Sequence, residues 1–205
     1  MKCNFRLETD FSDYYDAETN NEGALIYRRM DSERLQRGQE LKLLSSKIKN
    51  TIPFGKVSDI CKLSDRVVVY TNVNKHNGEG KIICNSRMAL DNFKNYLASP
   101  FIENTKGKSV KFLVIGDFIY KIYMHNDEFD NTLKAGVVDS IKESNKKEFS
   151  VKLDYPIYSV DFIVKPDGSL VACDFNSVEN LSKLGFNKIL SIDDILIQIN
   201  KSLVS

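Results

Sequence analysis

Two carboxylates and one amide near the C-terminal end are the side chains best suited to chemistry. Asp161 lies in one apolar run, and Asp174 and Asn176 lie in the next, with a Lys-Pro-Asp-Gly turn signal at 165–168 between them. Because side chains alternate along a strand, Asp174 and Asn176 share one face while Phe175 points to the other. Carboxylate and amide oxygens are ligands that Mg²⁺ prefers. We therefore expect a magnesium site on this hairpin; the alternative is that its polar side chains point to solvent.

Composition narrows the class of protein. With 205 residues the chain is long enough for one domain or for one domain built of two lobes. Its net charge of +1 provides no global attraction for nucleic acid or an anionic membrane. The four cysteines form no C-x-x-C pair and the chain has two histidines, which argues against a zinc site. No apolar run approaches the roughly 20 residues of a membrane span. The N-terminal residues lack the apolar core of a signal peptide, so we expect a cytoplasmic protein.

Hydrophobic patterning and turn signals predict hairpins interspersed with helices, which is typical of an α+β fold rather than a βαβ series. We expect strands at 67–70, 82–84, 110–115, 118–123, 160–164 and 170–176. We expect helices at about 31–49 (capped by Asp31 or Ser32), 86–97 (capped by Ser86), 137–142 and 192–203.

A glycine-rich segment lies between two of the expected strands. Gly78 and Gly80 would let backbone N–H groups approach phosphate oxygens, and Lys75 or Lys81 would add positive charge. The spacing is not that of a Walker A loop, because Ile82 stands where that loop has Ser or Thr. A glycine-rich β-turn is the alternative interpretation.

Taken in chain order, four segments resemble the ATP-grasp family, most closely the branch of the ribosomal-protein glutamate ligases. Residues 101–117 resemble that family's hinge and its D-I-R-x-x-V-x-G-D strand, and residues 129–136 resemble its F-R-S-N-L-x-x-G segment. Asp161 with residues 174–177 resembles its D…E-V-N-S metal motif, and residues 78–80 fall where its phosphate-covering loop lies. The resemblance covers roughly residues 64–205.

The resemblance implies an ATP-grasp-like α+β fold, in which two lobes with antiparallel sheets enclose a nucleotide cleft. Residues 1–63 would then be a reduced N-terminal substrate segment, 64–100 the small lobe with the glycine loop, and 101–205 the large lobe with the metal hairpin. It also implies ATP and Mg²⁺ as cofactors, and small-molecule or peptide carboxylates and amines as substrates. The carboxylate would be phosphorylated to an acylphosphate that the amine attacks, and the oligomeric state stays open.

Carried over by position, the resemblance assigns a role to each matching residue. Asp161, Asp174 and Asn176 would hold Mg²⁺, and Lys111 would be the catalytic cation beside the γ-phosphate and acylphosphate. The nucleotide would be bound by Lys75, Gly78, Gly80, Lys81, Phe101, Ile102 and Asn131.

This sequence departs from the family at two places that matter for chemistry. The family's ATP-binding lysine, on the strand before the glycine loop, falls at Tyr70 or Thr71, so Lys75 or Lys81 would have to compensate. The family's phosphate-side Arg and Asn are replaced by Asp130 and Thr132. Three functions therefore stay open: an ATP- and Mg²⁺-dependent carboxylate–amine ligase, a degenerate module that binds a nucleotide or a protein partner without catalysis, and a structural protein with an acidic hairpin.

Overall fold

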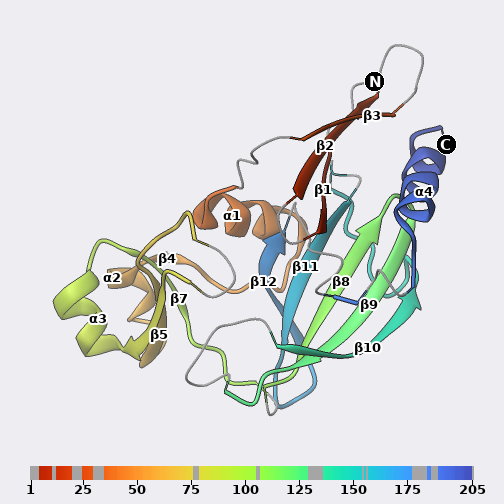
Figure 1. The fold of residues 1–205 in the computed structure, drawn as a ribbon. Coiled ribbons are helices and arrows are strands. Elements are labelled where there is room, and N and C mark those ends of the chain that lie inside the picture. The colour runs from red at the N-terminus through yellow and green to blue at the C-terminus, as the bar shows by residue number, and fades with distance from the viewer. Residues whose placement is uncertain are drawn as a thin grey trace.

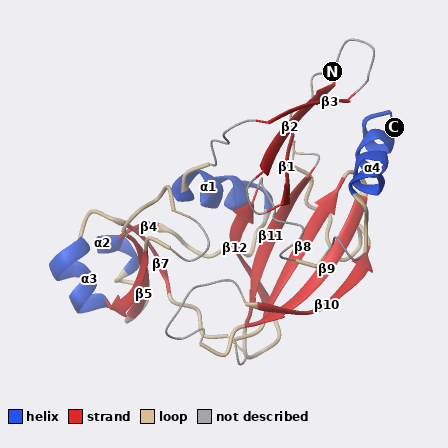
Figure 2. Ribbon diagram, in the orientation of Figure 1, coloured by secondary structure: helices blue, strands red, loops and turns tan. Residues whose placement is uncertain are grey.

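Three antiparallel sheets and four helices make up the described part of the chain (Figures 1 and 2). The computed structural model describes residues 5–10, 13–19, 25–29, 35–75, 79–104, 107–128, 136–153, 155, 157–176, 184–185 and 189–204. None of the helices within these ranges is both long enough and apolar enough to cross a membrane.

The largest sheet has five strands in the order β10-β9-β8-β11-β12, each antiparallel to its neighbours. Its strands are β8 (Ser109–Ile115), β9 (Phe118–His125), β10 (Val137–Ser144), β11 (Ile157–Val164) and β12 (Leu170–Asn176). Glycines close its two tightest turns, because Gly116 and Gly168 adopt φ values of 59° and 81°, a region that side chains with a Cβ avoid. The two hairpins expected from the sequence are confirmed.

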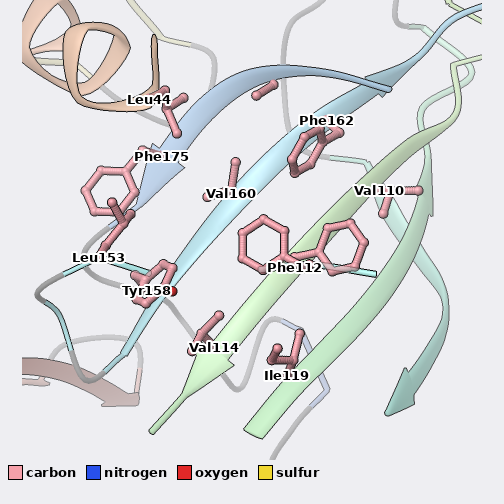
Figure 3. Packing of buried hydrophobic residues seen from close by; sticks show 12 residues of the cluster. Leu44, Val110, Phe112, Val114, Ile119, Leu153, Tyr158, Val160, Phe162 and Phe175 are labelled. Carbon is pink, nitrogen blue, oxygen red and sulfur yellow. The ribbon is translucent and has the colours of Figure 1, made fainter. Parts of the chain in front are cut away.

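Strand alternation gives this sheet two apolar faces. On one face, Leu113, Ile115 and Ile157 pack against Ile195 and Ile199 of α4 (Ile192–Val204). The opposite face carries Phe112, Phe162 and Phe175, together with Leu44 from α1 (Arg37–Lys47), as Figure 3 shows. The core is therefore built on both sides of the sheet, as the nearly continuous apolar sequence of β8 requires.

A four-stranded sheet in the order β4-β7-β5-β6 forms a smaller unit. Its elements are β4 (Gly55–Lys56), α2 (Val57–Ile60), β5 (Arg66–Tyr70), β6 (Lys81–Asn85), α3 (Ser86–Phe93) and β7 (Leu97–Pro100). One face packs on α2 and α3 through Val57, Val67, Val69 and Ala89. The other face meets Leu41 of α1 and Val171 of β12, which joins the small unit to the large one.

The chain enters the small unit along the outer edge of the large sheet. The Ala172 amide donates to the Asn50 carbonyl at 2.9 Å, and the Ile52 amide donates to the Ala172 carbonyl at 2.8 Å. Residues 50–52 therefore pair with β12 as a short parallel bridge centred on Thr51. Both backbone groups of Ala172 on this edge of β12 are therefore satisfied by the chain itself.

The N-terminal region forms a separate antiparallel sheet of β1 (Phe5–Asp10), β2 (Asp13–Thr19) and β3 (Leu25–Arg29). In Figure 1 its strands extend beside the large sheet, on the same side as the C-terminal end of α4. The division of the chain at residues 63 and 100, expected from the family resemblance, stays a prediction.

Three local predictions were wrong. Residues 137–142 form part of strand β10 rather than a helix, because the edge of β9 offers a complete ladder of partners and Val138 and Ile141 pack on the core. A six-residue helix lacks the length to be stable by itself.

Helix α1 begins at Arg37, several residues later than expected, while Asp31 and Ser32 lie outside the described residues. The cap of α3 is Asn85, whose side chain accepts the Met88 amide at 2.8 Å, rather than Ser86.

Candidate functional site

A row of polar side chains interrupts the α4-facing side of the five-stranded sheet. Asp161 of β11 lies opposite both Lys111 of β8 and Asp174 of β12, and Ser159 lies opposite Asn176. Residues directly opposite in an antiparallel pair share a face. The structure thus brings the three residues expected to bind metal to one place, together with Lys111.

A β-bulge sets this arrangement. The register of β11 and β12 shifts between Asp161 and Phe162, and Cys173 is the additional residue of β12. Its thiol donates to the Asp161 carbonyl at 3.4 Å, and burial, followed by the nearby charges of Asp161 and Asp174, raises the pKa of that thiol. Cys173 is consequently an inert thiol with a structural role.

Asp174 is held by an arginine from a distant part of the sequence. Arg37, at the start of α1, donates from both terminal nitrogens to the two Asp174 oxygens, with Nη2 at 3.2 Å from Oδ2. Its Nη1 also lies 3.1 Å from Oε2 of Glu40. Burial alone would raise the pKa of Asp174, but the charges of Arg37 and Lys81 and the hydrogen bonds from Arg37 outweigh it and lower this pKa to about 2. The Asp174 side chain is anionic and bidentately paired.

Asp161 has its own cation. Nζ of Lys111 lies 3.1 Å from Oδ1 of Asp161 and 3.2 Å from the Ser159 hydroxyl. The amide nitrogen of Asn176 donates to Oδ2 of Asp161 at 3.3 Å and to the Ser159 hydroxyl at 3.5 Å. Lys111 is nearly as buried as Arg37, whereas the Asp161 and Asp174 side chains keep 26% and 20% of their surface exposed. The two cations are therefore more deeply buried than the carboxylates that they contact.

Tyr70 and Lys81 complete the site from the four-stranded sheet. They are directly paired in β5 and β6, and Nζ of Lys81 lies 5.9 Å from the centre of the Tyr70 ring. The Tyr70 hydroxyl is 3.0 Å from that of Ser99, and burial raises its pKa to about 12. Burial and then the charge of Arg37 lower the pKa of Lys81, while Asp174 partly offsets this effect. We call Arg37, Glu40, Lys81, Lys111, Asp161 and Asp174 the charged cluster.

The two lysines expected to compensate for the lysine missing at Tyr70 or Thr71 lie on either side of the glycine loop and have different surroundings. Lys75 forms an exposed ion pair with Glu79 at 3.5 Å, whereas Lys81 reaches the charged cluster. Gly80 has φ 65°, and a Cβ there would lie 2.8 Å from the Asn72 carbonyl oxygen, so the tight turn itself requires glycine. Gly78 lies outside the described residues.

The residues expected at the adenine lie at the connection between the two sheets. Phe101 and Ile102 belong to the apolar cluster that joins Tyr70, Leu41 and Val171. Phe101 is buried, and the guanidinium carbon of Arg66 lies 4.0 Å from its ring centre. Asn131 lies outside the described residues.

Solved structures with a similar fold include one ligase and two synthetases. An L-amino acid ligase from Bacillus licheniformis superposes with a TM-score of 0.55 at 15% identity, over 82% of this chain and 47% of that one. D-cycloserine synthetase DcsG gives 0.53 at 15% identity, over 82% and 69%. N5-carboxyaminoimidazole synthetase from Staphylococcus aureus, complexed with ADP, gives 0.51 at 14% identity, over 80% and 51%.

This chain has the ATP-grasp fold. The fold class expected from the sequence is therefore confirmed. The chain spans about half the length of two of these proteins, at 47% and 51%. No protein-family model and no curated protein matches the sequence.

Arg37 and Glu40 were missed by sequence reasoning. With Leu41 and Leu44 they follow the i, i+3, i+4, i+7 spacing of one helix face, and all four are buried. Charged residues on the apolar face of a helix indicate that they have an ion-pair partner elsewhere in the protein, because an unpaired charge is costly to bury. The sequence carries that signal, but it does not say that the partner is Asp174.

The Mg²⁺ expected from the family does not fit these residues as they are arranged. Both Asp174 oxygens contact the Arg37 guanidinium, and the Asn176 amide presents nitrogen to Asp161. A divalent ion bound to Asp174 would lie beside the positively charged guanidinium and would have to displace it from at least one carboxylate oxygen. Within the described residues, no group of three or more His, Cys, Asp or Glu side chains is arranged to hold a metal.

Proposed function

We propose that this chain binds an adenine nucleotide between its four-stranded and five-stranded sheets, with the phosphates at Lys81. The proposal is supported by the ATP-grasp fold, since two proteins of similar fold are N5-carboxyaminoimidazole synthetases complexed with ADP. Adenine would lie at Phe101 and Ile102, beside the apolar cluster that connects the sheets. The phosphates would extend toward the charged cluster.

The position of Lys81, a buried lysine beside the charged cluster, is the observation that supports this proposal most strongly. Lys81 is directly paired with Tyr70, which is, with Thr71, one of the two positions at which the family's ATP-binding lysine falls. Within the described part of the chain its ammonium group forms no ion pair, in contrast to Lys75. Because burial and Arg37 lower its pKa, an anion beside Lys81 would recover favourable electrostatic energy. A phosphate group of a bound nucleotide would be this anion, because proteins of similar fold are complexed with ADP.

Binding without chemistry is the outcome that the arrangement of charges favours. The carboxylates that would hold Mg²⁺ in an active ligase are paired with Arg37 and Lys111. Tyr70, buried and with its pKa raised to about 12, brings no positive charge to the transferring phosphoryl group. The chain would then be an ATP-grasp module that senses or carries a nucleotide, or presents it to a protein partner.

Ligation is the second candidate, favoured by the fold shared with carboxylate–amine ligases. In that reaction a substrate carboxylate attacks the γ-phosphorus of ATP, and an acylphosphate and ADP form. The amine then attacks the acyl carbon, inorganic phosphate leaves, and the amine gives up a proton as the amide forms. Lys111 would stabilise the acylphosphate only after leaving Asp161, from which it lies 3.1 Å.

Thermal denaturation with ATP tests the binding proposal. A ligand at about 100-fold above its Kd stabilises the folded state by about 3 kcal/mol, which raises the Tm of a chain of this size by roughly 6–10 °C. We expect ATP with Mg²⁺ to give such an upward shift in the native protein and in Lys75→Met. The Lys81→Met variant should lose it. No shift in the native protein would contradict nucleotide binding.

The pH dependence of binding gives a second measurement at Lys81. The charged ammonium binds phosphate, and its lowered pKa means that it loses its proton earlier than an ordinary lysine as the pH rises. Affinity for ATP should therefore fall between neutral pH and about pH 10 in the native protein. In Lys81→Arg, which stays charged, it should stay flat over this range. An equal pH dependence in both proteins would exclude Lys81 from the phosphate site.

An assay for ADP and phosphate separates the two candidate functions. If the chain only binds nucleotide, mixtures of amino acids and short peptides should not stimulate release of ADP and phosphate from ATP. Stimulated release that disappears in Lys111→Met would establish ligation instead. Lys121→Met, which removes a half-buried lysine of β9 paired with Glu148, is the matched control.

A further inference from the structure

Two buried cations occupy the surroundings in which a divalent ion would be expected. Arg37 is 1% exposed and contacts both Asp174 oxygens, and Lys111 is 7% exposed and contacts Asp161. They come from different elements, α1 and β8, and each meets one carboxylate of the same face. One positive charge is thus supplied to each carboxylate from inside the protein.

The remaining polar groups of this face are arranged around those cations. The Ser159 hydroxyl lies 3.2 Å from Nζ of Lys111, and the Asn176 amide nitrogen bonds both Ser159 and Asp161. A metal site of this type requires the opposite arrangement, with the Asn176 carbonyl oxygen directed at the ion. Hydrogen-bond donors, rather than acceptors, converge on Asp161.

The balance of charges in the charged cluster also argues against a bound divalent ion. Arg37 and Lys111 are paired with Asp174 and Asp161, Glu40 contacts Arg37, and the charges of Asp174 and Glu40 also act on Lys81. The charged cluster therefore sums to zero without a metal. A divalent ion is retained by excess negative charge, and the six described residues of the charged cluster carry none.

From these contacts we infer that Arg37 and Lys111 are built-in replacements for divalent cations, so that Asp161 and Asp174 serve as their counter-ions rather than as metal ligands. Any anionic ligand at this face is then bound independently of Mg²⁺. The first part concerns the chain alone. The second part rests on the proposed nucleotide binding.

Manganese binding tests the first part directly. Electron paramagnetic resonance counts free Mn²⁺, and the native protein should leave its signal unchanged up to about 1 mM ion. The Lys111→Met variant exposes Asp161 to the ion and should gain a site at least about tenfold tighter. The double variant Lys111→Met/Asp161→Asn should lose that gain, and Lys121→Met should behave as the native protein.

The native protein decides the question even where a variant fails to fold. One Mn²⁺ bound per native chain at sub-millimolar concentration, and lost in Asp174→Asn, would overturn the inference. Arg37→Gln provides a second route to the same gain, because it releases Asp174 instead of Asp161. A folded Lys111→Met and a folded Arg37→Gln that both gain nothing would also overturn it.

The second part is tested by ATP in EDTA. The upward shift in Tm should be the same in EDTA and in Mg²⁺, to within about one degree. A shift that appears only with Mg²⁺ would overturn the inference while leaving nucleotide binding intact. No shift under either condition would refute the proposed function, and the Mn²⁺ titration would still decide the role of the two cations.

Discussion

Asp174 and Phe175 are neighbours on β12, yet they are held in place by different interactions: an ion pair for Asp174 and apolar packing for Phe175. Phe175 faces Leu44, Val160 and Tyr158, within the aromatic cluster of Figure 3. Asp174 faces the other way and is held by Arg37. Apolar packing is tolerant, because many neighbours share the contact. A buried ion pair depends on one partner, so its loss leaves an uncompensated charge. The two sides of one strand should therefore respond differently to substitution.

The largest effect is expected on the apolar side. Phe175→Ala should lower the free energy of unfolding by about 4 kcal/mol, because a fully buried phenyl ring is replaced by a cavity. Urea denaturation measures the change. Phe118→Ala, at a side chain that is 40% exposed, is the matched control and should cost less than about 1 kcal/mol. Equal costs at the two positions would contradict the role of this cluster as the core.

Removing the cation on the charged side should cost about 3 kcal/mol. Arg37→Met leaves Asp174 and Glu40 without their partner, and the value is at the low end for a buried pair because the Asp174 side chain keeps 20% of its surface exposed. A compensating variant, Arg37→Met/Asp174→Leu, should recover part of the loss in urea denaturation. Further destabilisation by the second substitution would show that the pair is not the source of the effect.

Acid should remove the contribution of Asp174 and leave that of Phe175 unchanged. The pKa of Asp174 is lowered to about 2, so the carboxylate stabilises the fold above the ordinary carboxyl pKa of about 4, and this stabilisation is lost as the pH falls toward 2. The difference in unfolding free energy between the native protein and Asp174→Asn should therefore shrink by about 2 kcal/mol from pH 5 to pH 2. The difference for Phe175→Ala should stay constant. A gap for Asp174→Asn that does not change with pH would contradict the lowered pKa.

The smallest effect is expected for an ion pair that is partly exposed to solvent. Lys121, whose side chain is 23% exposed, lies 3.2 Å from Glu148, whose side chain is 49% exposed. Lys121→Met should change the free energy of unfolding by less than about 1 kcal/mol, and added salt should reduce the change further. A cost comparable to that of Arg37→Met would mean that burial is not what distinguishes the two pairs.

The sequence predicted the apolar side of β12 more completely than its charged side. Alternation and the turn at Gly168 are local signals, and they placed Asp161, Asp174 and Asn176 on one face. The partner of Asp174 lies 137 residues away in the chain, and no local pattern encodes such a pairing. The metal interpretation rested on the oxygen atoms that these three side chains bring together, and the sequence does not say that Arg37 and Lys111 contact the two carboxylates. Likewise, residues 137–144 form strand β10 because they pair with the edge of β9, and this tertiary pairing cannot be deduced from the local sequence.

The short bridge at Thr51 determines how the four-stranded unit is attached. The chain reaches that unit from Ile52, bonded to β12, and leaves it through Phe101, which packs in the same apolar cluster as Ile52. Both connections of the four-stranded unit therefore meet at one apolar cluster, together with Leu41 of α1 and Val171 of β12. A substitution that loosens this cluster would weaken both connections at once, and with them the placement of Lys81 beside the large sheet.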